Sequence, residues 1–175
     1  MLQVVLVVVI GIIVAILFFA TTRPDEFHVH RQTTIKAPRD RIFPFLTDFH
    51  RWTQWSPWEN LDADLKRSYS GADSGEGAAY AWEGQKAGTG SMEIMRVEAP
   101  AEVLINLHFQ KPMKAENRVE FTLNDDGGQT RVDWTMTGRA PYLHKLMTMF
   151  VSMDKIIGKQ FEQGLAQLKA AAERA

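Results

Sequence analysis

The sequence predicts an α+β fold: a curved antiparallel sheet of about seven strands, two short helices after the first strand, and one long C-terminal helix over a cavity. Apolar side chains recur at every second residue in several segments between residues 27 and 138, which is typical of strands with one buried face. From residue 141 the apolar spacing changes to three and four, which is typical of an amphipathic helix. A separate apolar run at the N-terminus predicts a transmembrane helix.

This N-terminal run, residues 4–20, contains no charged or strongly polar side chain. A helix rises about 1.5 Å per residue, so a run of this length spans a bilayer core of about 30 Å. No basic residue precedes the run, and Phe18 stands where a cleaved signal peptide would need a small residue. We therefore predict an uncleaved transmembrane anchor over 1–20, a linker over 21–26, and one domain over 27–172.

The flanking charges predict the orientation of this anchor. Basic residues follow the run but none precedes it: Arg23, Arg31, Lys36, Arg39 and Arg41. The positive-inside rule then predicts a single-pass membrane protein with its C-terminal domain in the cytoplasm, and the lack of cysteine is compatible with a reducing compartment. A net charge of −1 gives no electrostatic reason to expect a nucleic-acid partner. The oligomeric state is left open.

The first part of the domain reads as a strand followed by two short helices. The alternation FHVHRQTTIK predicts a strand over 27–36, and Pro38 ends it. Short helices are expected over 42–46 and 48–55, because Ser56 precedes a proline and disfavours a longer helix.

Six further strands are predicted, and glycine-rich turns at 71–77, 84–90 and 124–128 separate several of them. Their expected ranges are 65–70, 78–83, 90–98, 102–110, 115–124 and 129–138. Three of them alternate cleanly between an apolar and a polar face, which predicts a sheet with one face in water.

The C-terminal segment from Pro141 to Ala172 carries one apolar stripe, which predicts a helix of about thirty residues. Gly158 and Gly164 each cost up to about 1 kcal/mol inside a helix. They therefore predict a close approach to the sheet or to a cavity. A helix across a curved sheet commonly leaves a pocket between the two.

Four segments of the domain resemble one known superfamily. They are IKAPRDRIFPFLTDFHRWTQWSPWE at 35–59, GTGSMEI at 88–94, FQKPM at 109–113 and MDKIIGKQFEQGLAQLK at 153–169. Together they resemble the START-like (SRPBCC) superfamily of the polyketide cyclase/dehydrase type, which has the helix-grip fold. Members bind lipids, hormones, polyketides or quinones, and only some are enzymes. The resemblance therefore implies an apolar ligand pocket between sheet and helix, and it does not imply a reaction.

The predicted pocket lining consists of inward-facing aromatic, methionine and isoleucine side chains with two polar residues. The set is Trp55, Trp58, Tyr80, Trp82, Met92, Phe109, Asn117, Phe121, Trp134, Met136, Phe150, Met153, Asp154 and Ile157. Each aromatic or methionine side chain also has a simple alternative as core packing.

The two polar residues have alternatives of their own. Asn117 continues an apolar strand face, where an unpaired amide costs about 1–3 kcal/mol; it would orient a ligand, or reach water at the strand end. Asp154 would contact ligand, or pair with Lys155 or an arginine of the sheet.

The candidates for metal binding and catalysis are weak. His28 and His30 share a strand face, but no third ligand has suitable spacing. GTGS at 88–91 lacks the third glycine and the following helix of a dinucleotide loop. We therefore predict no cofactor, no metal and no assigned catalytic residue.

The sequence thus favours a membrane-anchored binding module for an apolar or amphipathic small molecule, such as a lipid, quinone or polyketide-like compound. One alternative is an enzyme of the cyclase/dehydrase or hydrolase type, with Asp154, Glu93 or a histidine as acid or base. The other is a protein-interaction domain whose pocket is filled by its own side chains.

Overall fold

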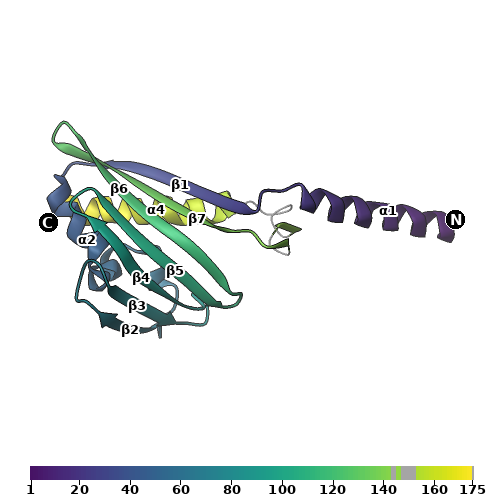
Figure 1. Ribbon diagram of the computed structural model, residues 1–175, viewed down its shortest axis with the longest axis horizontal. Helices are drawn as coiled ribbons and strands as arrows, with labels where there is room; N and C mark the ends of the chain where they lie inside the picture. Colours follow the sequence, from purple (N-terminus) through teal and green to yellow (C-terminus); the bar gives the residue numbers. More distant parts are fainter. Residues whose placement is uncertain (143–144, 147–152, 175) are drawn as a thin grey trace.

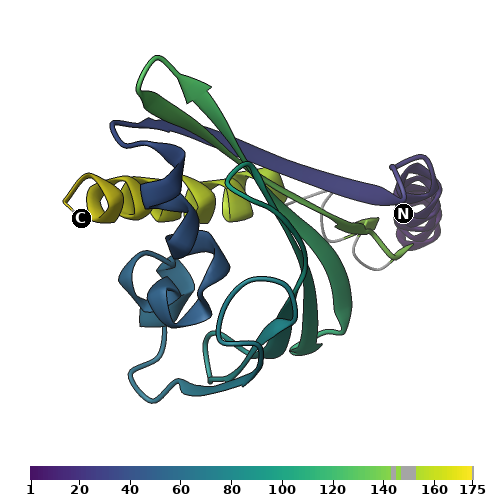
Figure 2. The same cartoon turned by 60° about the vertical axis from the view of Figure 1, so that its left-hand side comes forward.

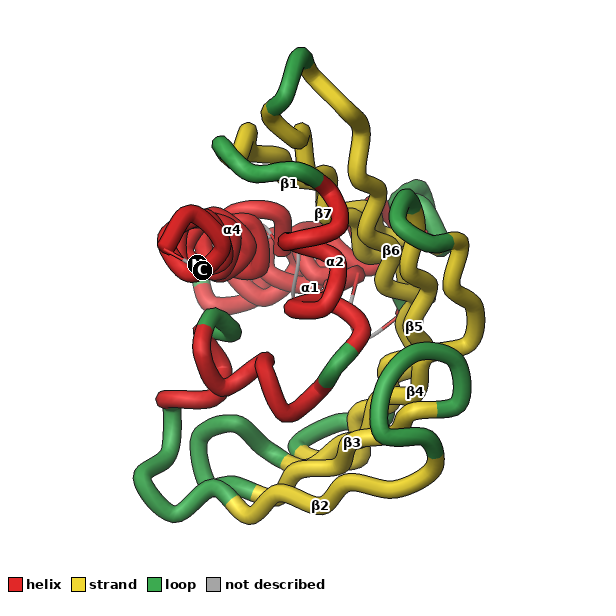
Figure 3. Tube along the Cα trace, turned by 90° about the vertical axis from the view of Figure 1, so that its left-hand side faces the viewer, coloured by secondary structure: helices red, strands yellow, loops and turns green. Residues whose placement is uncertain are grey.

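Seven antiparallel strands form one sheet that curves around the C-terminal helix (Figure 1). A computed structural model describes residues 1–142, 145–146 and 153–174. Along the sheet the strands follow the order β1-β7-β6-β5-β4-β3-β2, so only β1 and β7 are neighbours without being consecutive in sequence. Apart from the N-terminal helix, the described helices gather on the concave side of the sheet (Figures 2 and 3). The predicted α+β fold class is confirmed.

Every predicted strand is present, with ends that differ from the prediction by at most two residues. The strands are β1 (Glu26–Ile35), β2 (Lys66–Gly71), β3 (Ala78–Glu83), β4 (Thr89–Glu98), β5 (Glu102–Lys111), β6 (Ala115–Asp126) and β7 (Gln129–Arg139). On β6, for example, Val119, Phe121 and Leu123 are buried while the residues between them are not. The alternation in the sequence therefore reported the two faces of the sheet correctly.

Both predicted short helices are present, but the second is a 3-10 helix, and another 3-10 helix follows it. The described helices are α1 (Leu2–Thr21), α2 (Arg39–Thr47), the 3-10 helices η1 (Phe49–Gln54) and η2 (Pro57–Asn60), and α4 (Met153–Arg174). The predicted second helix is the short 3-10 helix η1, and η2 begins at Pro57, where the fixed φ of proline suits a first helical turn. The predicted long helix is described from Met153 onward, while 143–144 and 147–152 lie outside the described residues.

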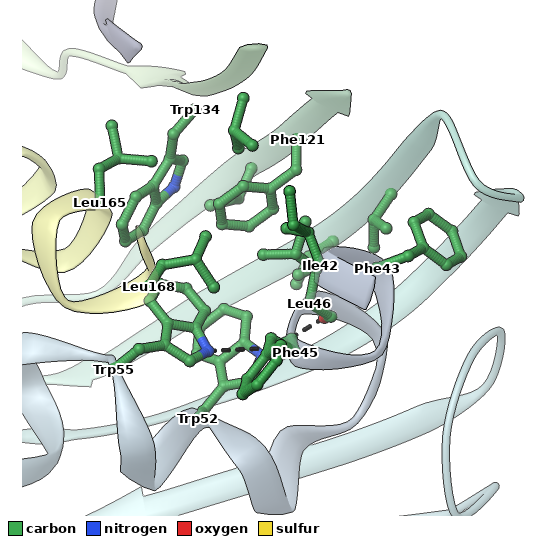
Figure 4. Close-up of a cluster of buried hydrophobic side chains, with 14 of the residues drawn as sticks. Ile42, Phe43, Phe45, Leu46, Trp52, Trp55, Phe121, Trp134, Leu165 and Leu168 are labelled. Carbon is green, nitrogen blue, oxygen red and sulfur yellow. Dashed lines mark hydrogen bonds between the residues drawn. The ribbon is translucent and has the colours of Figure 1, made fainter. Parts of the chain in front are cut away.

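The two indoles of η1 and its C-terminal cap tie this turn to the end of α2. Trp52 donates its indole N–H to the Leu46 carbonyl at 3.3 Å, and Trp55 donates to the Phe45 carbonyl at 2.9 Å (Figure 4). These carbonyls lie in the last turn of α2, where no helical N–H follows to pair with them. Both indoles are almost fully buried, so they join the short helices to the core.

Arg31 of β1 fixes the start of α4. Its guanidinium donates to Asp154 at 2.9 and 3.1 Å and to Glu162 at 2.7 Å. A Cβ at Gly158, midway between these carboxylates, would overlap the guanidinium. The space at Gly158 is therefore occupied by Arg31, and neither a ligand cavity nor the sheet backbone lies there. The expected pairing of Asp154 with an arginine of the sheet is observed.

Gly164 allows α4 to lie close to the sheet. A Cβ there would come within 2.8 Å of the Trp134 ring and 3.1 Å of Pro57. The Trp134 ring stacks on Phe161, one turn earlier on α4, with ring centroids 4.0 Å apart. Close approach, one of the two roles expected for this glycine, is what the structure shows.

A buried ionic network joins η2 to β2 and β3, at the edge of the sheet opposite β1. The Glu59 carboxylate accepts hydrogen bonds from Arg67 at 2.6 Å and from the Tyr80 hydroxyl at 2.7 Å. The Glu59 side chain is only 5% exposed, so its charge depends on these partners. Burial, followed by the bond to Glu59, raises the pKa of Tyr80 far above its usual value. Tyr80 therefore remains a neutral donor fixed on η2.

Helix α1 extends away from the domain and is long and apolar enough to cross a membrane (Figure 1). Its side chains are mostly exposed, whereas Ala20 at its end is fully buried. The Tyr142 hydroxyl donates to the Leu17 carbonyl at 2.9 Å. The end of α1 is thus held against the domain at the place where β1 begins.

The Arg31 ion pairs predict a specific coupling with Gly158. Gly158→Ala in an Arg31→Ala background should stabilise the fold by about 0.5–1 kcal/mol, because alanine has the higher helix propensity. In the native background the same change displaces the guanidinium. It should then stabilise the fold less than in the Arg31→Ala background, or destabilise it. Denaturant titration followed by tryptophan fluorescence measures both. Equal effects in the two backgrounds would contradict the packing of Arg31 on Gly158.

The pH dependence gives a check on the same contact. Arg31 holds the pKa of Asp154 below its usual value of 3.8. The contribution of Asp154 to the free energy of unfolding is therefore fully present above about pH 4. It is lost as the pH falls through the lowered pKa. The effect of Gly158→Ala on the free energy of unfolding should therefore differ less between the native and the Arg31→Ala backgrounds at acid pH than at neutral pH.

The Glu59 network predicts a large effect from removing one partner. Arg67→Met should destabilise the fold by about 3–5 kcal/mol, because it leaves a buried carboxylate without its cation. Adding Glu59→Gln should recover part of this loss, since the amide oxygen still accepts from Tyr80. Arg96→Met, which removes an arginine from an exposed pair with Glu102, is the control and should cost far less. A double variant no more stable than Arg67→Met would refute the assignment.

Candidate ligand-binding site

One row of inward-facing side chains crosses the sheet close to the end where β1 begins. The strand register places its members side by side from β1 to β3 in the order Phe27, Gly138, Asn117, Leu107, Met92 and Tyr80. We call these residues the inner row. The hydrogen bonds between β1 and α4 begin at Arg31, four positions beyond Phe27. The polar contacts of the described part of α4 therefore lie beyond the inner row.

A second row, the rim, lies between the inner row and the end of the sheet. It consists of Trp82, Gly90, Phe109 and Ala115. The Trp82 ring lies over Gly90, where a Cβ would come within 2.5 Å of it, and it meets Phe109 edge to face at a centroid distance of 5.7 Å. Trp82 and Phe109 are only partly buried, so the rim presents apolar surface at the boundary of the core.

Asn117 is the polar exception in the inner row. Its carboxamide oxygen is buried and, among the described residues, accepts no hydrogen bond. A Cβ at the neighbouring Gly138 would overlap this oxygen and come within 2.7 Å of the Phe27 ring. The glycine therefore makes room for the amide beside an aromatic ring. An unpaired buried amide costs about 1–3 kcal/mol, so this oxygen is a candidate for contact with a ligand.

Several predicted lining residues lie deeper, in contact with one another. Trp55, Phe121, Trp134 and Met136 are at most 5% exposed. Trp134 lies 5.4 Å from Trp55 and 4.9 Å from Phe121 between ring centroids (Figure 4). These side chains form the closed core next to the inner row.

The Trp134 indole nitrogen is the second buried polar atom that lacks a hydrogen-bond partner among the described residues. Trp58 and Ile157 are partly buried and pack against the edge of the core cluster.

Two predicted residues fall outside the description of side chains: Phe150 is not among the described residues, and only the backbone of Met153 is described. Asp154 has a side chain 53% exposed and pairs with Arg31, which places it away from the inner row. Glu93, considered as an acid or base, is exposed on the opposite face of the sheet. Of the predicted set, the structure brings Tyr80, Met92 and Asn117 together on the inner row, with Trp82 and Phe109 on the rim.

The sequence reasoning did not include Phe27, Leu107, Gly90 and Gly138 in the site. Phe27 and Leu107 were recognisable as inward-facing residues from the alternation of their strands. The two glycines carry no such signal, because their role depends on which side chain lies across from them in the register.

The outer face of the sheet, away from the helices, carries two open hollows at the same end. Their volumes are about 240 and 450 Å³, and their linings mix polar and apolar surface from β4 to β7 together with Glu26. His108 and Glu116 contribute to both. Asn117 and Gly138 of the inner row also line the first hollow, and Phe109 and Ala115 of the rim also line the second, so the hollows adjoin the apolar site.

Of the two histidines considered for metal binding, His30 has a carboxylate neighbour. His30 Nε2 lies 3.0 Å from the Asp133 carboxylate on β7. Within the part of the chain that the structure describes, no group of three or more potential metal ligands occurs.

Comparison with known proteins agrees with this architecture. Residues 26–173 match the family model described as polyketide cyclase/dehydrase and lipid transport, whereas no curated protein matches.

Three solved structures are similar in fold. Protein CV1439 from Chromobacterium violaceum has 15% identity and a TM-score of 0.61 over 86% of this chain and 99% of its own. The Aha1 dimer from Colwellia psychrerythraea has 17% identity and a TM-score of 0.59 over 84% and 96%. Protein MLL2253 from Mesorhizobium loti has 18% identity and a TM-score of 0.60 over 85% and 98%. At these identities the likeness concerns the fold alone. The family match covers almost the whole domain, and the chain therefore belongs to the polyketide cyclase/dehydrase and lipid transport family.

Proposed function

We propose that this protein is a membrane-anchored binding module for an apolar or amphipathic small molecule of the lipid, quinone or polyketide-like kind. The ligand would lie against the rim and the inner row, at the end of the sheet nearest α1. The observation that carries the proposal is the unpaired Asn117 oxygen set among apolar side chains. The family description, which includes lipid transport, supports the same class of ligand.

The position of the site relative to α1 supports a ligand that comes from the bilayer. Four residues separate the end of α1 from the start of β1, which carries Phe27 as its second residue. The inner row therefore starts close to the membrane. An apolar molecule leaving the lipid phase would need to cross little water to reach the rim.

The chemistry of the inner row predicts the shape of the ligand. Apolar burial at about 25 cal/mol per Å² would supply most of the binding free energy. A carboxamide oxygen accepts hydrogen bonds, so it selects a ligand with a hydroxyl or N–H group. The Tyr80 hydroxyl is committed to Glu59, which leaves Asn117 to orient the ligand.

A catalytic role has less support. Asp154 is engaged by Arg31, Glu93 lies on the outer face, and Tyr80 is a neutral phenol held by Glu59. The inner row and the rim thus present apolar contact and one amide, which suits binding and orientation more than proton transfer.

The role of Asn117 can be tested with two probes that differ by one hydroxyl, 1-pyrenebutanol and 1-butylpyrene. Asn117→Leu should weaken binding of the alcohol about fivefold, as expected for the loss of one hydrogen bond of about 1 kcal/mol. It should leave binding of the hydrocarbon nearly unchanged. The variant should also be about 1 kcal/mol more stable without ligand, because an unpaired buried amide is removed.

Asn106→Leu is the matched control, because Asn106 lies on the outer face of β5. It should change neither affinity. If Asn117→Leu weakened both probes equally, or neither, Asn117 would not orient the ligand. Absence of saturable binding of both probes to the unmodified protein would contradict the binding function itself.

The anchor and its orientation can be tested with a single cysteine, because the chain contains none. The full chain should resist alkaline carbonate extraction, and a chain that begins at Thr22 should be released. A Gln129→Cys variant should react with a membrane-impermeant maleimide only after the cells are opened. Labelling of intact cells would reverse the predicted orientation.

A further inference from the structure

The hairpin turns at the two ends of the sheet carry opposite charge. The β3–β4 and β5–β6 turns lie at the end where β1 begins, and their basic residues are Lys86, Lys111 and Lys114, with no acidic residue from 84 to 88 or from 111 to 114. The turns at the other end carry acidic residues at Asp73, Glu76, Glu98, Glu102, Asp125 and Asp126. The hairpin turns are therefore basic at one end of the sheet and acidic at the other.

The basic end is the one that α1 holds near the bilayer. β1 begins and β7 ends beside α1, and the β5–β6 turn lies at the same end of the sheet (Figure 1). The burial of Ala20 and the hydrogen bond from Tyr142 to Leu17 fix the end of α1 on the domain. With α1 in the membrane, these two turns would face the lipid headgroups.

The lysines of these turns are exposed to contact with another surface. All three side chains are exposed, and none lies in an ion pair with a carboxylate of a described residue. Asp62 accepts from the backbone N–H groups of Lys86 and Ala87. These bonds, and then the charge of Lys86, hold the pKa of Asp62 below its usual value. Glu83 pairs with Lys66 at 3.9 Å. Glu116 follows the β5–β6 turn on the outer face of β6 and is the exposed acidic residue closest in sequence to Lys114.

The β5–β6 turn also exposes an apolar side chain between its lysines. Met113 is 46% exposed and is flanked by Lys111 and Lys114 across Pro112. A basic turn with one apolar side chain matches the interface of an anionic leaflet, where lysines meet phosphates and an apolar group enters the acyl boundary.

We propose that the β3–β4 and β5–β6 turns dock the domain on an anionic lipid surface. This inference rests on the anchor assigned under the proposed function and adds a second, electrostatic membrane contact. The contact would also direct the binding site. Trp82 of the rim donates its indole N–H to Ala87 in the β3–β4 turn at 3.1 Å, and Phe109 lies two residues before Lys111. Docking of the turns would therefore set the rim against the bilayer.

The test uses the full chain in nanodiscs of phosphatidylcholine alone or with added phosphatidylglycerol. A fluorescent nitrobenzoxadiazole label is attached to Gln110→Cys near the basic turns or to Gln129→Cys at the acidic end. Both native residues are glutamines exposed close to strand ends, so the two variants are matched. A lipid with a spin-labelled headgroup then quenches any label that lies at the membrane surface.

The label at residue 110 should be quenched at least severalfold more than the label at residue 129 in anionic nanodiscs. The excess should fall in neutral nanodiscs and in the variant Lys86→Gln/Lys111→Gln/Lys114→Gln. It should also fall between about 0.1 M and about 1 M salt, because the screening length shortens from about 10 Å to about 3 Å. The salt series needs no lysine substitution, so it holds even if the triple variant folds poorly.

Two results would overturn the proposal. The first is equal quenching at residues 110 and 129 in anionic nanodiscs. The second is quenching at residue 110 that does not change with lipid charge, salt concentration or substitution of the three lysines. In both cases the chain remains in the nanodisc, so the anchor stands. A chain that does not incorporate into nanodiscs would instead refute the anchor, and the docking inference with it.

Discussion

The structure depends on the packing of Trp134, which joins the sheet to α4 and to the region of the 3-10 helices. Its ring stacks on Phe161 of α4, and Trp55 and Trp58 approach it edge to face from the region of the 3-10 helices. Gly164 lets α4 come close enough for this contact. Because these aromatic rings bury large areas in fixed geometries, they set the distance between helix and sheet. The closed core surrounds Trp134, and the inner row and the rim lie between this core and the end of the sheet where β1 begins.

Much of the fold can be predicted from the sequence, because burial of one face of a strand requires apolar residues at alternate positions. The alternation at Val119, Phe121 and Leu123 placed β6 and its inward face correctly, and the apolar stripe located Phe161, Leu165 and Leu168 on the buried face of α4. Asn117 was identified for the same reason, as an amide on an apolar face. Local periodicity therefore predicts the elements and the faces.

The remaining features depend on contacts between residues far apart in the chain. Nothing in the local sequence around Gly158 indicates that a guanidinium from β1 fills its space, and Gly138 gains its meaning only from Asn117 and Phe27 across the register. The buried Glu59 was missed because its partners, Arg67 and Tyr80, lie on two later strands. Pairings of this kind are fixed by tertiary packing, which single-sequence patterns do not report.

The central claim is that the end of the inner face nearest α1 binds an apolar molecule taken from the bilayer. Native mass spectrometry of the full chain, extracted from its own membrane into nanodiscs and then released, tests this most directly. The account predicts a population with one bound molecule that is largely apolar and carries a hydroxyl or N–H group, and that is depleted in Asn117→Leu. Recovery of the unliganded chain alone, under conditions that preserve lipid adducts on other membrane proteins, would contradict it.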